Sequence, residues 1–327
     1  MITNKGLKEI ISEYPELRHG LSGITEVAEG RMSNNFIIES GGEKYFLKRH
    51  RFLKRRPIDD SQAVERFFFL HGIPVVLPLR TKSGKIVLKR EGRFFSLFPF
   101  VSGSHFSDDK TPSLAAASLG QTLGRIHKAG ERGYPRIRDK FKPWDKESFH
   151  READAILKII DAKRNKSKFD KKIARTIRFK RSCVDKEYLR YEDMKNLRVG
   201  LIHGDYHDGN VFFDKKGVVK HVFDFEKTGI APFTFEVIRA IQYSHVTGYG
   251  KEKALGAVKR FLRGYTKERP LRNGELRDGM EIFYQKQIHS LWVEKEHYLY
   301  GNARVDNLLH SVSYLRRIGR SRTSLPY

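Results

Sequence analysis

Hydrophobic residues in the first hundred positions occur in short segments separated by turn residues. The segments 36–40 and 44–48 flank Gly41 and Gly42, and this spacing predicts two strands joined by a tight turn. The same kind of pattern predicts three further strands, at residues 73–79, 85–89 and 93–101. The beginning of the chain is therefore expected to be rich in β-structure.

One segment among these strands follows a helical repeat instead. Val64, Phe67 and Phe68 recur at the spacing that places them on one helix face. The polar residues 59–61 are predicted to cap the beginning of this helix, and residues 71–72 are predicted to end it.

Beyond residue 101 the pattern becomes mainly helical. Residues 102–112 are polar and predict a connector. The segment 113–129 predicts a helix with one apolar stripe, formed by Ala115, Leu119, Leu123 and Ile126. Helix is also predicted through most of 145–195 and from 234 to the C-terminus. The chain is therefore expected to have an α+β fold, in which a small β-rich part precedes a larger helical part.

Composition limits the class of protein. The 327 residues are 39% hydrophobic and 12% aromatic, which is enough to form cores, and the length suggests about two domains. No stretch approaches the roughly 18 apolar residues of a membrane span. The single cysteine, Cys183, excludes an intramolecular disulfide and a zinc site built from several cysteines. We expect a protein of the reducing cytoplasm with no membrane partner.

The charge is strongly positive. There are 64 Lys and Arg against 39 Asp and Glu, which gives a net charge of +25. Such a surface attracts nucleic acids, acidic membranes or small anions such as nucleotides. Much of the excess lies in two runs, 48–56 and 163–181, and the second has the character of a solvated helical face. Charge alone does not choose between a partner and simple solubility.

Residues 201–214 concentrate chemically active side chains between apolar neighbours. His203 and His207 are four positions apart, a spacing that suits two metal ligands on one helix. However, Gly204 and Gly209 would each weaken a helix here by about 1 kcal/mol, and oxygen ligands predominate over nitrogen ligands. A zinc site and a purely structural turn are the alternatives to a catalytic loop.

The residues that follow predict a hairpin that folds back onto this loop. Two short strands, 211–213 and 218–223, bring Asp224 towards Asp205 and Asn210. One carboxylate can orient a hydroxyl or accept its proton, while an amide oxygen and a second carboxylate can hold a hard cation such as Mg²⁺. Phosphoryl transfer from ATP needs this division of roles, because its catalysis is mostly positioning and charge neutralisation.

The motif H-G-D-x-x-x-x-N at 203–210, followed by D-F-E at 224–226, resembles the aminoglycoside phosphotransferase / choline kinase superfamily of small-molecule kinases. The segment LGRIH at 123–127 resembles a helix that these enzymes place before the catalytic loop. The resemblance implies a protein-kinase-like bilobal fold, with a β-rich N-lobe over 1–100 and a mainly helical C-lobe over 101–327. No G-x-x-x-x-G-K-[ST] sequence is present, so a P-loop ATPase is not supported.

The resemblance also implies roles for individual residues. Asp205 would be the catalytic aspartate beside the substrate hydroxyl, and Asn210 and Asp224 would hold Mg²⁺. Lys48, at the end of a strand, would contact the phosphates of ATP. Glu65, on the next helix, would be its ion-pair partner.

The nucleotide-covering loop is expected at residues 29–35. It keeps only Gly30 of the protein-kinase G-x-G-x-x-G, and Ser33 and Asn34 would offer polar contacts to the phosphates. The segment 97–103 would be the hinge whose backbone meets the adenine edge. These four assignments locate the donor nucleotide beside the β-rich part of the chain.

Three further residues are expected to support the site. His203 is expected to brace the catalytic loop by hydrogen bonding, and His207 to shape that loop or face the substrate. Glu226 replaces the glycine of the protein-kinase D-F-G, and it either reaches the metal or holds the loop.

The sequence therefore predicts a phosphotransferase that uses ATP and Mg²⁺ to phosphorylate a hydroxyl of a small amino alcohol, amino acid or sugar. GTP is the alternative donor. A kinase-like nucleotide-binding protein without turnover is a second hypothesis, which the intact site residues disfavour. A basic nucleic-acid-binding protein is a third, disfavoured because no recognisable nucleic-acid module is present. The acceptor and the oligomeric state are not indicated.

Overall fold

The computed structural model describes residues 2–27, 35–104, 113–138, 141–194, 196–246 and 251–324. The chain forms two compact units. Unit 1 comprises Met1–Lys140, Gly200–Ala231 and Arg239–Pro270, and unit 2 comprises Phe141–Val199, Pro232–Ile238 and Leu271–Tyr327. The division into an N-lobe over 1–100 and a C-lobe over 101–327 stays a prediction.

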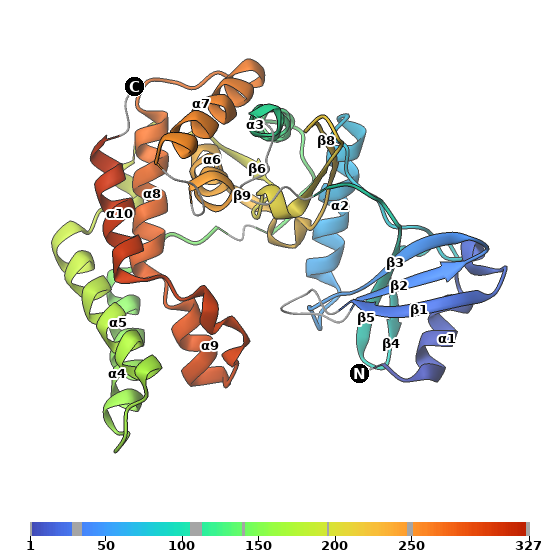
Figure 1. Cartoon of the computed structure of the whole chain (residues 1–327), viewed down its shortest axis with the longest axis horizontal. Coiled ribbons are helices and arrows are strands. Elements are labelled where there is room, and N and C mark those ends of the chain that lie inside the picture. Colours follow the sequence, from blue (N-terminus) through green and yellow to red (C-terminus); the bar gives the residue numbers. More distant parts are fainter. Residues whose placement is uncertain are drawn as a thin grey trace. The chain divides into compact units, whose positions relative to one another are not determined.

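An antiparallel five-stranded sheet in the order β1-β2-β3-β5-β4 forms the N-terminal part of unit 1 (Figure 1). Its strands are β1 (Leu21–Val27), β2 (Asn35–Ser40), β3 (Glu43–Arg49), β4 (Leu88–Arg90) and β5 (Arg93–Pro99). The hairpin predicted around Gly41 and Gly42 is confirmed, and both glycines have positive φ angles of 59° and 83°. Its register pairs Phe36 with Leu47, so the end of β3, where Lys48 lies, is fixed by the turn.

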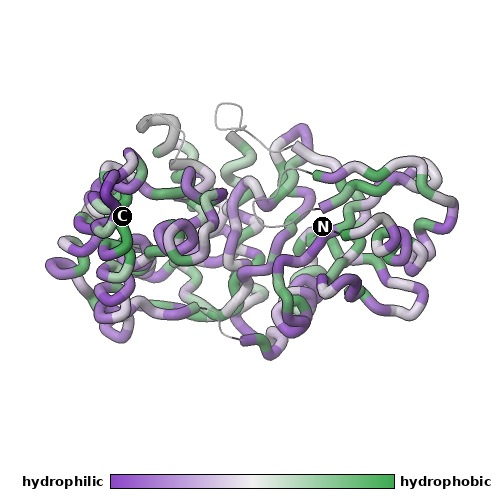
Figure 2. Tube along the Cα trace, turned by 90° about the horizontal axis from the view of Figure 1, so that it is seen from below, coloured by the Kyte–Doolittle hydropathy of each residue, from purple (hydrophilic) through white to green (hydrophobic). Residues whose placement is uncertain are grey.

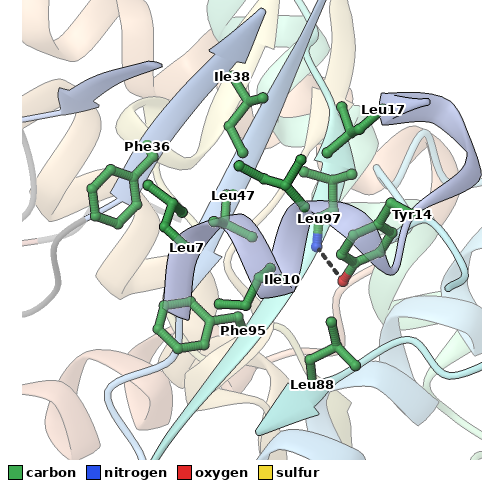
Figure 3. Packing of buried hydrophobic residues seen from close by; sticks show 11 residues of the cluster. Leu7, Ile10, Tyr14, Leu17, Phe36, Ile38, Leu47, Leu88, Phe95 and Leu97 are labelled. Atoms are coloured by element: carbon green, nitrogen blue, oxygen red, sulfur yellow. Dashed lines mark hydrogen bonds between the residues drawn. The ribbon is translucent and has the colours of Figure 1, made fainter. Parts of the chain in front are cut away.

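A helix that the sequence analysis did not identify, α1 (Asn4–Ser12), covers one face of this sheet. Figure 3 shows Leu7 and Ile10 packed against side chains of the strands, among them Leu47 and Phe95. Each such side chain, when fully buried, contributes about 1.5–3 kcal/mol to stability. Beyond the helix, the buried Tyr14 hydroxyl accepts a 3.3 Å hydrogen bond from the Leu97 amide.

Helix α2 spans Arg56–Leu70 and begins earlier than predicted. The expected cap at residues 59–61 is wrong, because these residues lie inside the helix. Pro57 provides the helix start, since its fixed φ angle suits a first turn. Asp59 instead forms an i,i+4 ion pair with Arg55 at 2.6 Å.

Two of the predicted strands are corrected by the structure. Residues 73–79 contribute only one bridge, between Val75 and Val222, because Pro74 and Pro78 lack the amide hydrogens of a continuous ladder. The strand predicted at 85–89 is limited to β4.

The rest of unit 1 contains the predicted short hairpin, which is formed by β7 (Val211–Phe213) and β8 (Val219–Val222). A second strand pair joins β6 (Val199–Ile202) to β9 (Gly229–Pro232). Helices α3 (Ser113–Ala129) and α7 (Lys251–Glu268) pack with their backbones in close approach, since a Cβ on Gly120 would lie 2.0 Å from the Phe261 carbonyl oxygen. Helix α6 (Phe233–Ile241) begins in a segment of unit 2, enters unit 1 at Arg239, and continues into a π-helical segment, Gln242–Val246.

Unit 2 is helical. Its helices are α4 (Lys146–Asp161), α5 (Lys168–Glu187), α8 (Glu275–His289), α9 (Trp292–Tyr300) and α10 (Val312–Ser324). The helix predicted over 145–195 is present as two helices, because Ser167 begins α5 with a capping box that includes Asp170. A buried ion pair joins Lys180 and Glu294 at 2.7 Å. Short 3₁₀ segments occur at Pro15–Leu17, Tyr191–Asp193, Asp208–Asn210, Phe225–Lys227 and Ala303–Leu308.

Hydrophobic and hydrophilic positions alternate over short distances along the chain (Figure 2). Among the described residues, no helix combines the length and the apolar character needed to cross a membrane.

Candidate active site

The loop between β6 and β7 carries the H-G-D motif and is braced by His203. This side chain is fully buried, and its Nδ1 accepts a 3.2 Å hydrogen bond from the Asp205 amide. Its Nε2 therefore carries the hydrogen, which it donates to the Phe223 carbonyl oxygen at 3.0 Å. One imidazole thus joins the loop to the residue that precedes Asp224.

Gly204 allows this loop to lie directly against the segment after the hairpin. Its φ angle is +85°, and a Cβ placed here would lie 2.0 Å from the Lys227 carbonyl oxygen. Only glycine satisfies both conditions, so this position fixes Asp205 beside residue 227.

Asn210 connects the loop to both ends of the hairpin. Its side-chain Nδ2 donates to the Asp205 carbonyl oxygen at 2.8 Å, and its own carbonyl oxygen accepts from the Phe223 amide at 3.1 Å. Since the Nδ2 group is engaged in this way, the amide oxygen Oδ1 remains available as a ligand. The structure therefore brings Asp205, Asn210 and Asp224 together, as the hairpin was expected to do.

Asp224 has a left-handed backbone conformation, with φ 65° and ψ 61°. Glu91 is the only other described non-glycine residue with a positive φ angle. Such a conformation costs about 1–3 kcal/mol and persists only where the surroundings impose it, often at functional sites. The Asp224 carboxylate forms an ion pair with Lys48 Nζ at 3.1 Å.

Lys48 lies at the end of β3 and is largely buried. Its ammonium group contacts Asp224 at 3.1 Å and Glu226 at 3.0 Å. Burial alone would lower the pKa of Lys48, but the Asp224, Glu226 and Glu65 carboxylates raise it above its usual range. Lys48 is therefore a permanent cation beside Asp224.

Glu226 lies against two cationic side chains and one imidazole, all from the residues that end and follow β3. Besides Lys48, it pairs with Arg51 at 2.9 Å, and His50 Nδ1 lies 3.7 Å away. Burial would raise its pKa, but these neighbours lower the pKa of Glu226 to about 2. The sequence analysis assigned no role to His50 or Arg51, because both belong to the basic run 48–56 and resemble surface charge.

Glu65 lies buried on α2, but its predicted ion pair with Lys48 is not among the ion pairs of the described residues. Its Oε1 accepts a weak 3.5 Å hydrogen bond from Ser61, and its Oε2 has no hydrogen-bond partner within the described part of the chain. Burial raises the pKa of Glu65 to about 8, although the charge of Lys48 opposes this. Glu226 takes the position beside Lys48 that was expected for Glu65.

The Asp205 carboxylate is flanked by two cations that the sequence analysis missed. Lys227 Nζ lies 2.8 Å from its Oδ2, and Arg239 of α6 contacts its Oδ1. Burial would raise the pKa of Asp205, but Arg239 and Lys227 hold it below its usual range. Lys227 follows D-F-E directly, whereas no spacing rule identifies Arg239, which is 34 residues from Asp205.

His207 has a local role in shaping the loop. Its Nδ1 accepts a 3.0 Å hydrogen bond from the Gly209 amide. The adjacent Asp208 amide donates to the Ser244 hydroxyl at 3.0 Å, which ties the loop to the segment after α6.

The remaining predicted contacts lie at the nucleotide side. Gly30, Ser33 and Asn34 fall outside the described residues. The expected hinge segment 97–103 begins in β5, and its Phe100 amide donates to the Lys44 carbonyl oxygen at 3.2 Å. Phe100 is exposed and Phe98 is half-buried.

The donor set suits a hard cation rather than zinc. Among the described residues, no group of three or more His, Cys, Asp and Glu side chains is placed to hold a metal ion. Asn210 Oδ1 and the 41%-exposed Asp224 carboxylate offer oxygen ligands, which is the ligand type that Mg²⁺ and Ca²⁺ prefer. These two residues fit a cation that takes its other ligands from phosphates and water.

Solved structures that share this fold include a kinase and a phosphotransferase of small molecules. The amicoumacin kinase hAmiN, solved with AMP-PNP and Ca²⁺, matches with a TM-score of 0.65 and 17% identity over 99% of this chain and 92% of its own. A spectinomycin phosphotransferase, APH(9)-Ia, matches with a TM-score of 0.65 and 14% identity over 99% of both chains. The predicted α+β, protein-kinase-like fold is confirmed.

Curated relatives include homoserine kinases. The enzyme of Caulobacter vibrioides (strain NA1000 / CB15N) is 25% identical over 248 residues, which cover 75% of this chain and 72% of the relative. That of Phenylobacterium zucineum is 27% identical over 289 residues, which cover 84% and 79%. Together with the family match below, these relatives confirm the prediction of a kinase that phosphorylates a hydroxyl group.

The model of the phosphotransferase enzyme family, APH, matches residues 23–310. This range includes β3, the H-G-D loop and the D-F-E segment, which carried the resemblance seen in the sequence. The chain therefore belongs to the phosphotransferase enzyme family.

Proposed function

We propose that the protein transfers the γ-phosphoryl group of ATP to the hydroxyl of a small molecule, with Asp205 as the catalytic aspartate. The observation that carries this proposal is the convergence, within unit 1, of Lys48, Asp205, Asn210 and Asp224. These residues come from three separate stretches of the chain, and the arrangement has the parts that phosphoryl transfer requires.

Lys48 serves the donor nucleotide. Its ammonium group is held by Asp224 and Glu226, so its position is set before ATP arrives. Asn210 and Asp224 would hold Mg²⁺, which neutralises charge on the phosphates when it is bound. The neighbouring structure with AMP-PNP and Ca²⁺ supports a nucleotide and a divalent cation as ligands of this fold.

Asp205 serves the acceptor. Because its pKa is held below the usual range, it is ionised at neutral pH and is a weak base. It therefore orients the acceptor hydroxyl by accepting its hydrogen bond, and it receives the proton as the new O–P bond forms and the bond to ADP breaks. A loose transition state requires little base strength, so positioning matters more than proton affinity.

The acceptor class is an amino acid, amino alcohol or small sugar with a free hydroxyl. Homoserine and aminopropanol are suitable first compounds, because similar proteins include homoserine kinases and a microcompartment-associated aminopropanol kinase. A cytoplasmic location and ATP rather than GTP as the donor belong to the same proposal.

The test is Mg²⁺-dependent ADP release against a panel of small hydroxyl compounds, with the wild type beside Asp205→Asn. We expect one compound to be phosphorylated, with a loss of at least about 100-fold in kcat for the variant, as is typical when a positioned base is removed. Asp161→Asn, at the exposed end of α4, is the matched control and should retain full activity. Equal activity of Asp205→Asn and the wild type would reject the assignment of Asp205.

A binding readout separates the donor from the acceptor. If Mg-ATP raises the melting temperature but no compound is phosphorylated, a nucleotide-binding protein without turnover is favoured instead. If Mg-ATP has no effect on stability, the nucleotide site itself is wrongly assigned.

A further inference from the structure

Two cationic side chains contact the single negative charge of the Asp205 carboxylate. Lys227 at 2.8 Å is sufficient to balance one carboxylate, yet Arg239 contacts the other oxygen as well. The cluster of Asp205, Lys227 and Arg239 therefore carries a net charge of +1 at the position where the acceptor hydroxyl must lie. An excess cation in a partly buried cluster has a desolvation cost, which a bound anion would offset.

Carboxylates on the donor side of the loop are also engaged. Asp224 pairs with Lys48, and Glu226 pairs with Lys48 and Arg51. A polycationic acceptor would find these carboxylates already paired, and it would meet Lys227 and Arg239 beside the reactive aspartate. The electrostatics of this cluster thus disfavour cationic acceptors.

Arg239 has the geometry of an anion-binding residue. It lies in the last turn of α6, and its guanidinium group stacks 4.7 Å from the centroid of the Tyr243 ring. While one terminal nitrogen contacts Asp205, the other, Nη1, has no hydrogen-bond partner among the described residues. A planar guanidinium with one engaged and one unengaged nitrogen can bridge the catalytic carboxylate and a second carboxylate.

We propose that the acceptor carries a carboxylate a few carbon atoms from its hydroxyl, and that Arg239 recognises this carboxylate with help from Lys227. The acceptor hydroxyl then donates a hydrogen bond to Asp205, while the carboxylate of the acceptor contacts the adjacent Arg239 guanidinium. One ion cluster therefore orients both ends of a hydroxy acid. Lys227 is suited to the second contact because its side chain is 48% exposed. This inference rests on the proposed function, and it specifies the substrate class of the same site.

Matched pairs of acceptors test the inference. Homoserine and 3-aminopropanol share a hydroxyl and an ammonium group and differ by the carboxylate, as do serine and ethanolamine. Steady-state kinetics of the wild type with each pair are compared with Arg239→Met and Arg239→Lys. The exposed Arg263 of α7 provides the control variant, Arg263→Met.

We expect the wild type to prefer the carboxylate member of a pair by about tenfold or more in kcat/KM, because charge-assisted hydrogen bonds are among the stronger ones. Arg239→Met should raise KM for that member at least about tenfold and change KM for the decarboxylated member by less than about threefold. The KM of Arg239→Lys for the carboxylate member should lie between those of the wild type and Arg239→Met, since lysine keeps the positive charge but lacks the paired N–H donors of the guanidinium. Arg263→Met should match the wild type.

Three outcomes would overturn the inference. An equal loss for both members of a pair in Arg239→Met would mean that Arg239 acts only through Asp205. Phosphorylation of amino alcohols in preference to every hydroxy acid would reject the carboxylate while leaving the proposed phosphotransferase intact. No phosphorylation of any hydroxyl compound by the wild type would reject the proposed function, and this inference with it.

Discussion

Lys48 Nζ lies 3.1 Å from Asp224 Oδ1, although the two residues are 176 positions apart in the chain. This ion pair joins the end of β3 to the segment that follows β8. The same ammonium group contacts Glu226, so one lysine links the N-terminal sheet to both acidic residues of the D-F-E segment. The two parts of the candidate site that a nucleotide would bridge are therefore already connected within unit 1.

Replacing Lys48 should affect both ATP binding and stability. Lys48→Met leaves Asp224 and Glu226 without their shared cation. We expect the free energy of unfolding to fall by about 3 kcal/mol, which is at the lower end of the range for a broken buried ion pair. The loss is at the lower end because Arg51 still pairs with Glu226. Urea unfolding measures this loss, and the KM for ATP should rise by at least about tenfold. Lys44→Met on the same strand, where the side chain is 55% exposed, is the control.

The contribution of Glu226 to stability should depend on pH in the acid range. Its pKa is lowered to about 2 in the folded protein, from an ordinary value of 4.5. A depressed pKa stabilises the fold above the unfolded-state value, and this contribution is lost as pH falls from about 4.5 towards 2. Glu226→Gln should therefore be less stable than the wild type near pH 7, by about 3 kcal/mol if the full shift applies.

Urea unfolding of both proteins at pH 7, 5 and 3 measures this difference. The gap between Glu226→Gln and the wild type should narrow as the pH is lowered through 4.5. A gap that stays constant across the three values would show that the carboxylate charge does not stabilise the fold.

The two candidate partners of Lys48 can be ranked by mutation. Because Glu226 contacts Lys48 while Glu65 Oε2 has no hydrogen-bond partner among the residues that the structure describes, Glu226→Gln should raise the KM for ATP more than Glu65→Gln. The pKa of Glu65 is raised to about 8, so its contribution to stability is present below about 4.5 and is lost as pH rises through 8. Glu65→Gln should therefore be more stable than the wild type at pH 9.

ATP titrations and urea unfolding at pH 6 and 9 decide between the two carboxylates. If Glu65→Gln has the larger effect on the KM for ATP, Lys48 exchanges Glu226 for Glu65 when the nucleotide binds. In that case the predicted Lys48–Glu65 pair describes the nucleotide-bound protein.

Local patterns in the sequence were sufficient to predict the hairpins and the loop that carries the H-G-D motif, because their turns are fixed by glycine and by alternating apolar residues. Asp205, Asn210 and Asp224 converge for the same reason, since a short hairpin leaves little freedom in where its ends meet. Helix α1 was missed because its apolar positions are few, and it is stabilised by packing on the sheet rather than by its own propensity.

Contacts between distant residues could not be predicted in this way. Arg239 reaches Asp205 through the packing of α6, and Arg51 and His50 reach Glu226 through the fold of the N-terminal sheet. In a chain with 64 Lys and Arg, nothing local distinguishes Arg239 and Arg51 from the many exposed cations. The basic run 48–56 illustrates this, since its members divide between the buried cluster and the surface.

Gly204 should tolerate no side chain, whereas a glycine with a similar backbone elsewhere should. Gly204→Ala combines an unfavourable φ of +85° with a Cβ 2.0 Å from the Lys227 carbonyl oxygen, so the loop must separate from residue 227. Gly133→Ala is the matched control, because its φ is +67° and, apart from its chain neighbours, no atom of the described residues lies within 4 Å of the added Cβ. The free energy of unfolding of Gly133→Ala should fall by only about 1–2 kcal/mol, the cost of alanine in a left-handed conformation, and its kcat should be unchanged.

Gly204→Ala should lose more stability and at least about 100-fold in kcat, because Asp205 is displaced from Lys227 and Arg239. Equal stability and activity of the two variants would show that the close approach at Gly204 does not position the catalytic aspartate.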